Sequence, residues 1–394
     1  MRGSAPRRLR REALERGKAH YRMRVLFVIA HLDKGGGQAI QTLQLFRALR
    51  QTVDGHLLCL SAKGEGSSFE SEEGVEVVGP LTFPAGILRL RRAIRERMPS
   101  YDLLQAYDFY YALPAARLAR AHPIVVRLGA DPVEDFASRY RGVGRTWMRV
   151  WNPWLYADTK VVVNADHLLA TFPPGKAVTI ENGVDTSRFA AAPRTEEARS
   201  ELNLPSGVPL LAFTGKIVPR KNLEDLYTLL RSEPEFHLLL VGAQSEPYYG
   251  DHYFRRLCAE YADVLPRVHA VGEVSMGQVP RYLEATDVFV FPSHLEGMPN
   301  SVLEAMAAGL PVVASDYPAH RQLVTPETGF LYRSPGELRD AVRRLVTDAT
   351  LRRTMGQRGR ERVAARFSID AAVRAYLALY SEVIAGRRKS GLSR

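Results

Sequence analysis

The chain has 394 residues, of which 46% are hydrophobic and 25% are charged, and its formal net charge is +11. This balance is typical of a soluble globular protein and excludes an intrinsically disordered chain, while the length suits two α/β domains. No apolar run approaches the roughly 20 residues of a bilayer-spanning helix, and no apolar signal-peptide core stands near the start, so neither membrane-spanning helices nor secretion are expected.

The positive charge is concentrated at the two ends of the chain. Residues 1–24 carry nine basic and two acidic side chains, residues 386–394 carry four basic ones, and the body between them is neutral overall. A nucleic-acid enzyme is expected to carry a basic face on its folded domain, so nucleic acid is not an expected partner. The basic ends either hold the chain weakly at an anionic membrane surface or are simply solvated. Cys59 and Cys258 show no metal or redox spacing and are expected in the core of a cytoplasmic protein.

Strand and helix patterns alternate along the first half of the chain. Hydrophobic runs predict strands at 23–30, 56–60, 75–78, 102–106, 123–128, 159–163 and 177–181. Between them, helical patterns lie near 38–50, 86–97, 110–121, 141–156 and 165–170. After the turn 182–185, the Ala/Pro/Thr/Glu-rich stretch 190–197 is interpreted as the connection to a second domain.

The second half repeats this alternation. It predicts strands at 208–214, 236–241, 268–271, 287–292 and 311–315, and three closing helices at 335–347, 350–366 and about 369–385. Repeated β-α units with short connections favour an α/β fold with two doubly wound domains built on parallel sheets. Two such domains of similar size leave a cleft between them, and ligands of these folds bind at the carboxyl ends of the strands.

The segment after the strand at 287–292 carries the strongest functional signal. Glu296 lies in a loop, and Glu304 follows eight positions later, one turn into a short helix that is predicted to start near residues 299–301. A helix N-terminus at the carboxyl edge of a parallel sheet offers free N–H groups and a positive dipole end to an anion. Acids on both sides of it are suited to hold the hydroxyl groups of a nucleotide sugar.

The two acids differ in how well a local role explains them. Ser301 and Glu304 fit a capping box, in which the glutamate bonds back to the serine amide, so Glu304 is either a ligand-binding residue, a helix cap or both. Glu296 has no such local partner in the sequence, and an acid at the end of an apolar strand indicates a ligand site more strongly. Neither acid belongs to a spacing that gathers metal ligands, so no metal is predicted.

Two further loops favour phosphate. Gly215-Lys216 follows the strand at 208–214, and Lys221 precedes a helix, where a positive charge is unfavourable unless an anion is bound. The alternative is a basic, solvated loop. In the first domain, Gly35, Gly36 and Gly37 follow the strand at 23–30; they match neither the dinucleotide fingerprint nor a P-loop, but they permit backbone amides to approach a phosphate.

These residues together resemble the large family 4 of retaining glycosyltransferases (glycosyl transferases group 1), whose members have the GT-B fold of two Rossmann-like domains. The most specific part is Glu296-x7-Glu304 followed by Ala-Met-Ala-Ala-Gly309-Leu-Pro311, and the similarity extends over about 23–385. It implies a basic extension at 1–22, an acceptor domain at 23–190, a nucleotide-sugar donor domain at 198–368, a helix at 369–385 that crosses back to the first domain, and a basic tail at 386–394.

The resemblance also assigns roles to individual residues. It implies that Glu296 contacts the donor sugar and Glu304 the ribose, and that Lys216 and Lys221 neutralise the diphosphate. The residues implied as catalytic are Glu296, Lys216 and Lys221. Those implied to bind the donor are Gly36, Gly37, Gly215, Glu273, Val274, Gly297, Met298, Pro299, Asn300, Ser301 and Glu304.

One position departs from the family pattern. Many members carry His-Gly-x-Asp after the fifth strand, whereas this chain has Leu128-Gly129-Ala130-Asp131. A leucine cannot hydrogen-bond a sugar or move a proton. Asp131, Arg127 and Asp108 are the candidates for a catalytic or acceptor-binding role in the first domain, unless the reaction needs no imidazole at all.

The expected function is that of a retaining, metal-independent glycosyltransferase without a cofactor. It would move a sugar from a UDP- or GDP-sugar to a glycan, a lipid-linked acceptor or a small molecule. The alternatives are a GT-B nucleotide-sugar epimerase or hydrolase, and a nucleotide-sugar- or glycan-binding protein that has lost turnover together with its histidine. The expected location is the cytoplasm, with peripheral contact at the inner face of the membrane through the basic ends.

Overall fold

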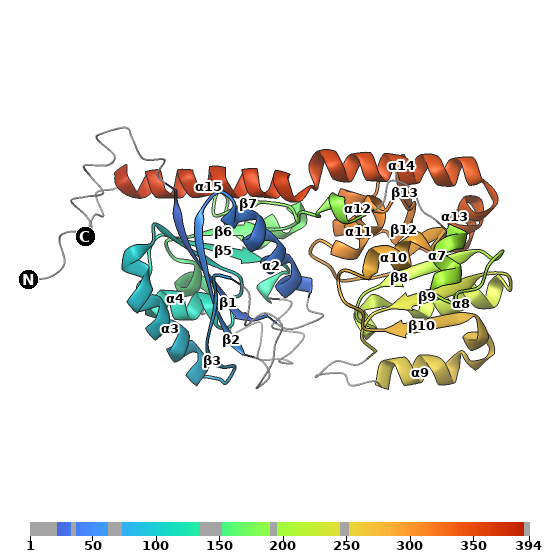
Figure 1. Cartoon of the computed structure of the whole chain (residues 1–394), viewed down its shortest axis with the longest axis horizontal. Helices are drawn as coiled ribbons and strands as arrows, with labels where there is room; N and C mark the ends of the chain where they lie inside the picture. The colour runs from blue at the N-terminus through green and yellow to red at the C-terminus, as the bar shows by residue number, and fades with distance from the viewer. Residues whose placement is uncertain are drawn as a thin grey trace, which may run out of the picture.

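Two parallel sheets with helices on both faces make up the molecule in a computed structural model, which describes residues 22–32, 37–61, 73–133, 152–189, 195–244 and 252–389 (Figure 1). The first sheet has the strand order β3-β2-β1-β4-β5-β6-β7, and the second has the order β10-β9-β8-β11-β12-β13. Each order turns back on itself next to the first strand of its sheet. This is the doubly wound arrangement that the alternating patterns predict.

The strands of the first sheet are hydrophobic throughout, because both of their faces are covered. They are β1 (Arg24–His31), β2 (Asp54–Ser61), β3 (Val75–Pro80), β4 (Leu103–Ala106), β5 (Ile124–Leu128), β6 (Thr159–Val163) and β7 (Ala177–Thr179). Along β1, Leu26 and Val28 face one apolar cluster, and Val25 and Phe27 face the other. This alternation is the two-residue period of a strand that is buried on both sides.

Helices from distant parts of the sequence cover these two faces. The first cluster includes side chains of α3 (Ala85–Arg97) and α4 (Ala112–Leu118), and the second includes side chains of α2 (Gly37–Arg50) and α15 (Ile369–Lys389). α4 is shorter at both ends than the helix expected at 110–121. The expected helix at 165–170 is a 3-10 helix, η2 (Asp166–Thr171), and η1 (Met98–Ser100) follows α3.

The second sheet consists of β8 (Leu210–Thr214), β9 (His237–Val241), β10 (Val268–Gly272), β11 (Val288–Phe291), β12 (Val312–Ser315) and β13 (Gly329–Tyr332). The last of these was not among the predicted strands. Its helices are α7 (Thr195–Glu201), α8 (Glu224–Ser232), α9 (His252–Glu260), α10 (Val279–Glu284), α11 (Asn300–Ala307), α12 (Pro318–Leu323), α13 (Pro335–Thr347) and α14 (Ala349–Arg366). Three short 3-10 helices complete this half, η3 (Thr186–Arg188), η4 (Pro219–Lys221) and η5 (Ala262–Arg267).

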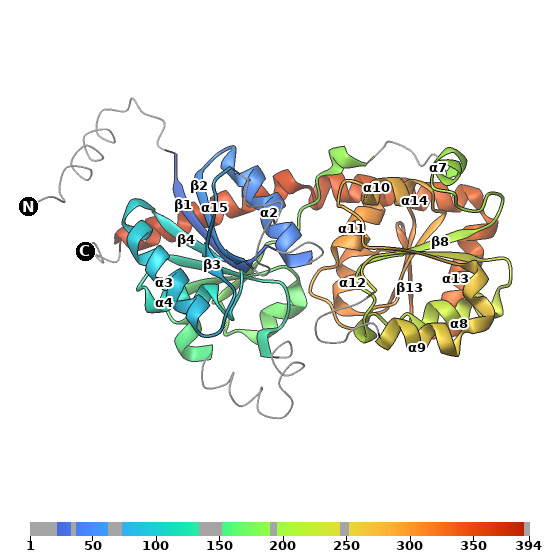
Figure 2. The ribbon, with the colours of Figure 1, turned by 60° about the horizontal axis from the view of Figure 1, so that its bottom comes forward.

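The last helix returns to the first domain. α14 lies along the second domain and α15 continues along the first (Figures 1 and 2). Tyr380 of α15 donates to Gln105 of β4 at 3.2 Å, and the Ile369 amide donates to the Val184 carbonyl at 2.9 Å, where the two chain crossings between the domains lie side by side. α15 extends a few residues beyond the expected end at 385.

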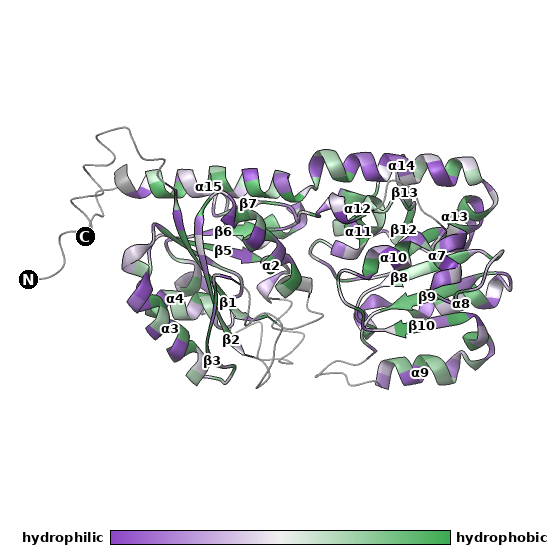
Figure 3. Ribbon diagram, viewed as in Figure 1, coloured by the Kyte–Doolittle hydropathy of each residue, from purple (hydrophilic) through white to green (hydrophobic). Residues whose placement is uncertain are grey.

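The helix surfaces are mixed in character. The strands of both sheets carry mainly hydrophobic residues, while helices such as α3 and α14 alternate hydrophilic and hydrophobic side chains (Figure 3). Within the part of the chain that the structure describes, no helix combines the length and the apolar character needed to cross a bilayer.

Candidate active site

The loop after β11 presents a buried ion pair at the carboxyl edge of the second sheet. Lys221 Nζ lies 2.5 Å from Glu296 Oε1, and Ser293 Oγ donates to the same oxygen at 2.6 Å. The side chains of Lys221 and Glu296 are only 10% and 11% exposed. The two residues are 75 positions apart in sequence and come from loops that follow neighbouring strands of the sheet.

Backbone contacts hold these two loops together. The Arg220 carbonyl accepts from the His294 amide at 3.1 Å and lies 3.2 Å from Ser293 Oγ, as a second, longer acceptor for the proton that this hydroxyl directs to Glu296. Asn222, in the left-handed region at φ 50°, ends η4 and turns the chain into α8. The Lys221 ammonium also lies 4.7 Å from the ring centroid of Phe291, a cation–π contact that contributes to its position.

Opposing effects set the ionisation of Glu296. Burial raises the pKa of this carboxyl, but the charges of Lys221 and Arg220 and the hydrogen bonds from Lys221 and Ser293 outweigh burial and bring the pKa below its usual value. Glu296 is therefore ionised at neutral pH, and its charge is already balanced by the cation beside it. Such a carboxylate accepts hydrogen bonds from hydroxyl groups and does not serve as a proton donor.

α11 starts beside this pair. Its N-cap is Pro299, which makes no side-chain cap hydrogen bond, so the capping-box alternative for Ser301 and Glu304 is not formed. Pro299 thus offers no side-chain cap to the first N–H groups of α11, which lie at the carboxyl edge of the sheet, where an anion can bind them.

Glu304 has a different environment from Glu296. Burial raises the pKa of Glu304 to about 7, opposed by Arg188, whose Nη1 lies 3.9 Å from Glu304 Oε1. Arg188 also donates to the carbonyl of Met276, which follows β10. Glu304 is thus close to half-protonated at neutral pH and faces the loop after β10 rather than Lys221.

The loop after β8 depends on two glycines. Gly215 and Gly242 have φ values of 138° and 150°, and a Cβ on Gly242 would lie 2.0 Å from the Gly215 carbonyl oxygen. Only glycine permits the ends of β8 and β9 to approach so closely. Lys216 follows Gly215 and is partly exposed at the same edge of the sheet.

The remaining expected donor-site residues surround this edge. Gly297 and Met298 are buried between Glu296 and α11, and Asn300 and Ser301 form the first turn of α11. Glu273 and Val274 follow β10, with Glu273 exposed and Val274 packed on the core. Gly37 is the first residue of α2, while Gly36 lies outside the described residues.

The first domain contacts the donor loop directly. A Cβ on Gly297 would lie 2.0 Å from the Gly129 carbonyl oxygen and 2.7 Å from Asn164 Oδ1, so the loops after β5 and β6 lie against Gly297. The two domains are therefore closed at this point. Leu128, at the position of the family histidine, is 2% exposed and packs in the core.

The three acceptor-domain candidates have clear structural partners. Asp108 accepts from the amides of Ala30, Tyr111 and Ala112. Asp131 accepts from the Val133 amide and from Thr171 Oγ1.

Arg127, the third of these candidates, donates to Asn182 in the segment between the domains. All three thus shape the edge of the first sheet, and each is engaged by other groups of the chain.

Several residues near the site were not among the predicted ones. Ser293 and Asn164 lie just after strands, and His167 lies in η2 just after β6; their place after a strand is the one signal in the sequence that marks them. Burial lowers the pKa of His167, while the Glu296 backbone, Asp131 and Asp166 oppose this shift. Neither ring nitrogen makes a hydrogen bond of normal geometry, and the ring lies 5.8 Å from that of Tyr317.

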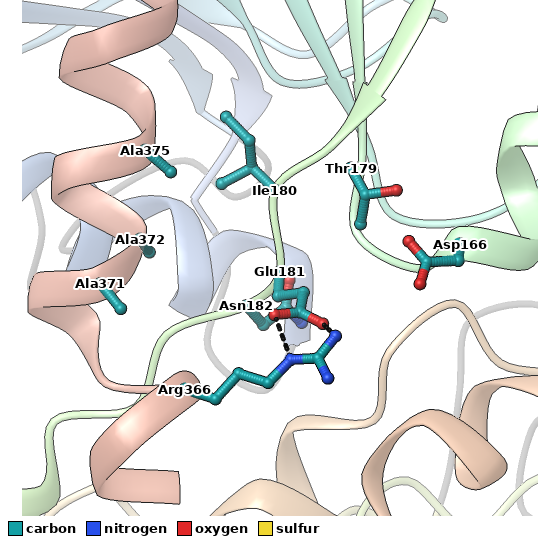
Figure 4. A pocket seen from close by; sticks show the side chains of 9 residues that line it. All are labelled: Asp166, Thr179, Ile180, Glu181, Asn182, Arg366, Ala371, Ala372 and Ala375. Atoms are coloured by element: carbon teal, nitrogen blue, oxygen red, sulfur yellow. Dashed lines mark hydrogen bonds and ion pairs between the residues drawn. The ribbon is translucent and has the colours of Figure 1, made fainter.

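A separate pocket of about 270 Å³ lies at the connection between the domains (Figure 4). Thr179, Ile180, Glu181 and Asn182 form one wall, and Ala371, Ala372 and Ala375 of α15 form another. Glu181 is paired with Arg366 at 2.6 Å and accepts from Gln322 Nε2 at 2.6 Å. The pocket is lined by the chain crossing and contains none of the groups around Glu296.

Comparison with known proteins places this site in a family. A model described as Glycosyl transferases group 1 matches residues 194–362. A GDP-mannose-dependent alpha-mannosyltransferase of Mycobacterium tuberculosis is 30% identical over 280 residues, which cover 67% of this chain and 70% of that protein. The chain belongs to the glycosyl transferases group 1 family.

Solved structures agree on the architecture. A sucrose-phosphate synthase from Thermosynechococcus elongatus superposes with a TM-score of 0.78 at 26% identity and covers 92% of this chain and 100% of its own. Anabaena HepE in complex with UDP-glucose has a TM-score of 0.76 at 20% identity over 91% of this chain and all of its own. The fold is GT-B, as expected, and the chain is a glycosyltransferase of group 1.

Proposed function

We propose that the chain transfers a sugar from a UDP- or GDP-sugar to a glycan, lipid-linked or small-molecule acceptor, with retention of the anomeric configuration and without a metal. The observation that supports this most is the buried pair of Lys221 and Glu296 in front of the uncapped N-terminus of α11. Among the described residues, no group of three or more His, Cys, Asp or Glu side chains is placed to hold a metal ion. Charge neutralisation by lysines and backbone amides is the alternative means of stabilising a diphosphate.

In this proposal each group has one task. Glu296 accepts hydroxyl hydrogen bonds from the donor sugar, Glu304 accepts them from the ribose, and the α11 amides with Lys216 and Lys221 stabilise the departing nucleoside diphosphate. The bond from the anomeric carbon to the phosphate oxygen breaks, and the acceptor oxygen bonds to the same face of that carbon. The acceptor proton passes to a phosphate oxygen of the leaving group, so no protein base is required. This route is compatible with Leu128 at the position of the family histidine.

Substitution of the ion pair tests the proposal. Glu296→Gln keeps the shape of the side chain but removes its charge, and Lys221→Met removes the cation. We expect the rate of sugar transfer to fall about 100-fold in each variant, because each loses a group that orients or stabilises the reacting centre. The measurement is sugar transfer from GDP-mannose, GDP-glucose, UDP-glucose and UDP-N-acetylglucosamine to an acceptor panel, with NMR of the product's anomeric proton. GDP-mannose comes first because of the mannosyltransferase relative.

The control is Asp263→Asn, which removes the exposed partner of Arg231 and touches neither loop of the site. It should transfer as wild type does. Wild-type rates in both Glu296→Gln and Lys221→Met, with folds intact by circular dichroism, would refute the site. Because Leu128 stands at the position of the family histidine, one other function is considered, which is nucleotide-sugar binding without turnover. Binding of the donor in titration calorimetry, together with no transfer to any acceptor, would support this function.

We also propose that the protein works at the cytoplasmic face of a membrane, in contact with anionic lipid. Most basic residues of the first end lie outside the described residues, whereas Arg387, Arg388 and Lys389 of the other end belong to the last turn of α15. The first domain adds a described surface, the α3 face, which consists of Phe83, Leu88, Arg92 and Arg95, all exposed. Exposed apolar side chains next to cations are suited to the headgroup region of an anionic bilayer.

A further inference from the structure

Arg127 is a buried cation with neutral neighbours. It is the next-to-last residue of β5 and is 3% exposed. Among the described residues, its hydrogen-bond partner is the side-chain oxygen of Asn182, and its charge also acts on the buried hydroxyl of Tyr376. Burial of a charge without a counter-ion costs free energy, so the contacts of this guanidinium must offset that cost.

The bond from Arg127 determines how Asn182 is oriented. A guanidinium only donates, so the atom of Asn182 that faces it is the carbonyl oxygen Oδ1. The amide nitrogen then points the other way. Nδ2 donates to the Met298 carbonyl at 3.1 Å and to Asn300 Oδ1 at 2.6 Å, and Asn182 itself is 4% exposed.

These two acceptors lie on either side of Pro299, the N-cap of α11. The Asn182 side chain thus binds the backbone carbonyl before Pro299 and the side chain of the residue after it, which is the first residue of α11. The charge of Arg127 polarises the Asn182 amide and strengthens its two donor bonds, because hydrogen bonds in a chain reinforce one another in a buried environment.

The hydrogen bonds from Arg127 through Asn182 to Met298 and Asn300 form a relay whose three parts belong to different parts of the molecule. Arg127 lies in the first sheet, Asn182 in the connection, and Met298 and Asn300 in the second domain. The domains are in contact here, since Gly297 lies against Gly129. A rotation of one domain away from the other would break the relay or move the start of α11.

We propose that Arg127 is a positioning residue that, through Asn182, holds the N-terminus of α11 in its donor-binding geometry when the domains close. Closure and binding of the nucleoside diphosphate are then coupled. The inference rests on the proposed function, because it assigns the α11 N-terminus to the donor's diphosphate. Arg127 itself contacts neither substrate.

Asn182→Asp separates positioning from folding. The new carboxylate pairs with Arg127 and so strengthens that end of the relay, but it cannot donate to the Met298 carbonyl and it repels Asn300 Oδ1. We expect a thermal midpoint at or above that of wild type at pH 7.5. At the same pH we expect the affinity for UDP and GDP, measured by titration calorimetry, to fall about tenfold or more.

Arg127→Met cuts the relay at its other end, and we expect it to weaken nucleoside diphosphate binding in the same direction. The double variant should bind no more weakly than Asn182→Asp alone, because both changes act through one chain of contacts. Gln322→Ala is the matched control: it breaks an interdomain contact to Glu181 that does not touch α11, and it should bind as wild type does.

The wild type is measured first. If it binds neither UDP nor GDP, the proposed function fails and the inference fails with it. If the wild type binds and a folded Asn182→Asp binds equally well, the inference alone is overturned. Should Asn182→Asp not fold, Arg127→Met decides by the same measurement, and unchanged affinity in that variant also overturns the inference.

Discussion

At the scale of single residues, two acids eight positions apart have opposite electrostatic properties. Burial acts on both, but Glu296 has Lys221 at 2.5 Å whereas Glu304 has only Arg188 at 3.9 Å. The pKa is consequently below its usual value for Glu296 and about 7 for Glu304. The distance to the nearest cation, and not the type of residue, decides which acid is charged at neutral pH.

The raised pKa of Glu304 makes a prediction about stability. The carboxyl loses its proton near pH 4.5 in the unfolded chain but only near pH 7 in the folded one, so the free energy of unfolding decreases as pH rises through this range. At ~1.4 kcal/mol per pKa unit the decrease is on the order of 3 kcal/mol. Glu304→Gln should remove most of it, so urea unfolding at pH 5 and pH 8 should differ less than in wild type.

The control for this prediction is Glu361→Gln, which changes an exposed carboxyl on α14. It should leave the difference between pH 5 and pH 8 close to that of wild type. If Glu304→Gln shows the full wild-type decrease between the two pH values, the buried carboxyl is not its source.

At the scale of elements, strand ends and helix starts decide where the site groups lie. The hydrophobic runs located β8 and β11 within a few residues, because strands buried on both faces are continuously apolar. β13 escaped prediction because it starts with glycine, which resembles a turn. Of the alternatives for Glu304, the capping box is not found, because α11 begins at Asn300 with Pro299 as its N-cap, one residue before Ser301.

Gly242 offers a test at this scale. Gly242→Ala would place a Cβ 2.0 Å from the Gly215 carbonyl at a φ of 150°, so the ends of β8 and β9 must separate. We expect a loss of about 3 kcal/mol or more in the free energy of unfolding, from backbone strain and displacement together. Binding of UDP or GDP should also weaken, because the Gly215-Lys216 turn moves.

Gly207→Ala is the matched control for Gly242→Ala. Gly207 also has a positive φ, 69°, but no atom lies within 4 Å of the added Cβ. It should cost only about 1 kcal/mol of backbone strain and leave nucleotide binding unchanged. Equal stability of the two variants would show that the approach of Gly242 to Gly215 is not required.

At the scale of the whole molecule, exposed apolar groups gather on one domain. Phe83 and Leu88 on the α3 face are 75% and 55% exposed, and Leu118 of the neighbouring α4 is 45% exposed. We expect the protein to sediment with vesicles that contain anionic lipid, and less so with neutral vesicles or at high salt, because the basic residues require anionic headgroups.

Phe83→Asp should reduce sedimentation with anionic vesicles several-fold, because it replaces an apolar contact with a charge that these lipids repel. Val271→Asp, on an exposed position of the second domain, is the control and should have no effect. Sedimentation of a chain that lacks residues 1–22 measures how much the basic extension contributes to vesicle binding. Equal sedimentation of wild type with neutral and anionic vesicles would contradict the proposal.

The amino-acid sequence by itself determined the class of fold and the family, and it supplied the donor-site residues that remain a prediction. Periodicity and apolar runs reflect local burial, and the segment from Glu296 to Gly309 has a specific spacing. The tertiary structure alone decided which groups pair. The contacts of Lys221 with Glu296 and of Asn182 with Met298 and Asn300 join residues 75, 116 and 118 positions apart. Such pairings, and the pKa values that follow from them, depend on distances between segments far apart in the sequence, which no local pattern of residues encodes.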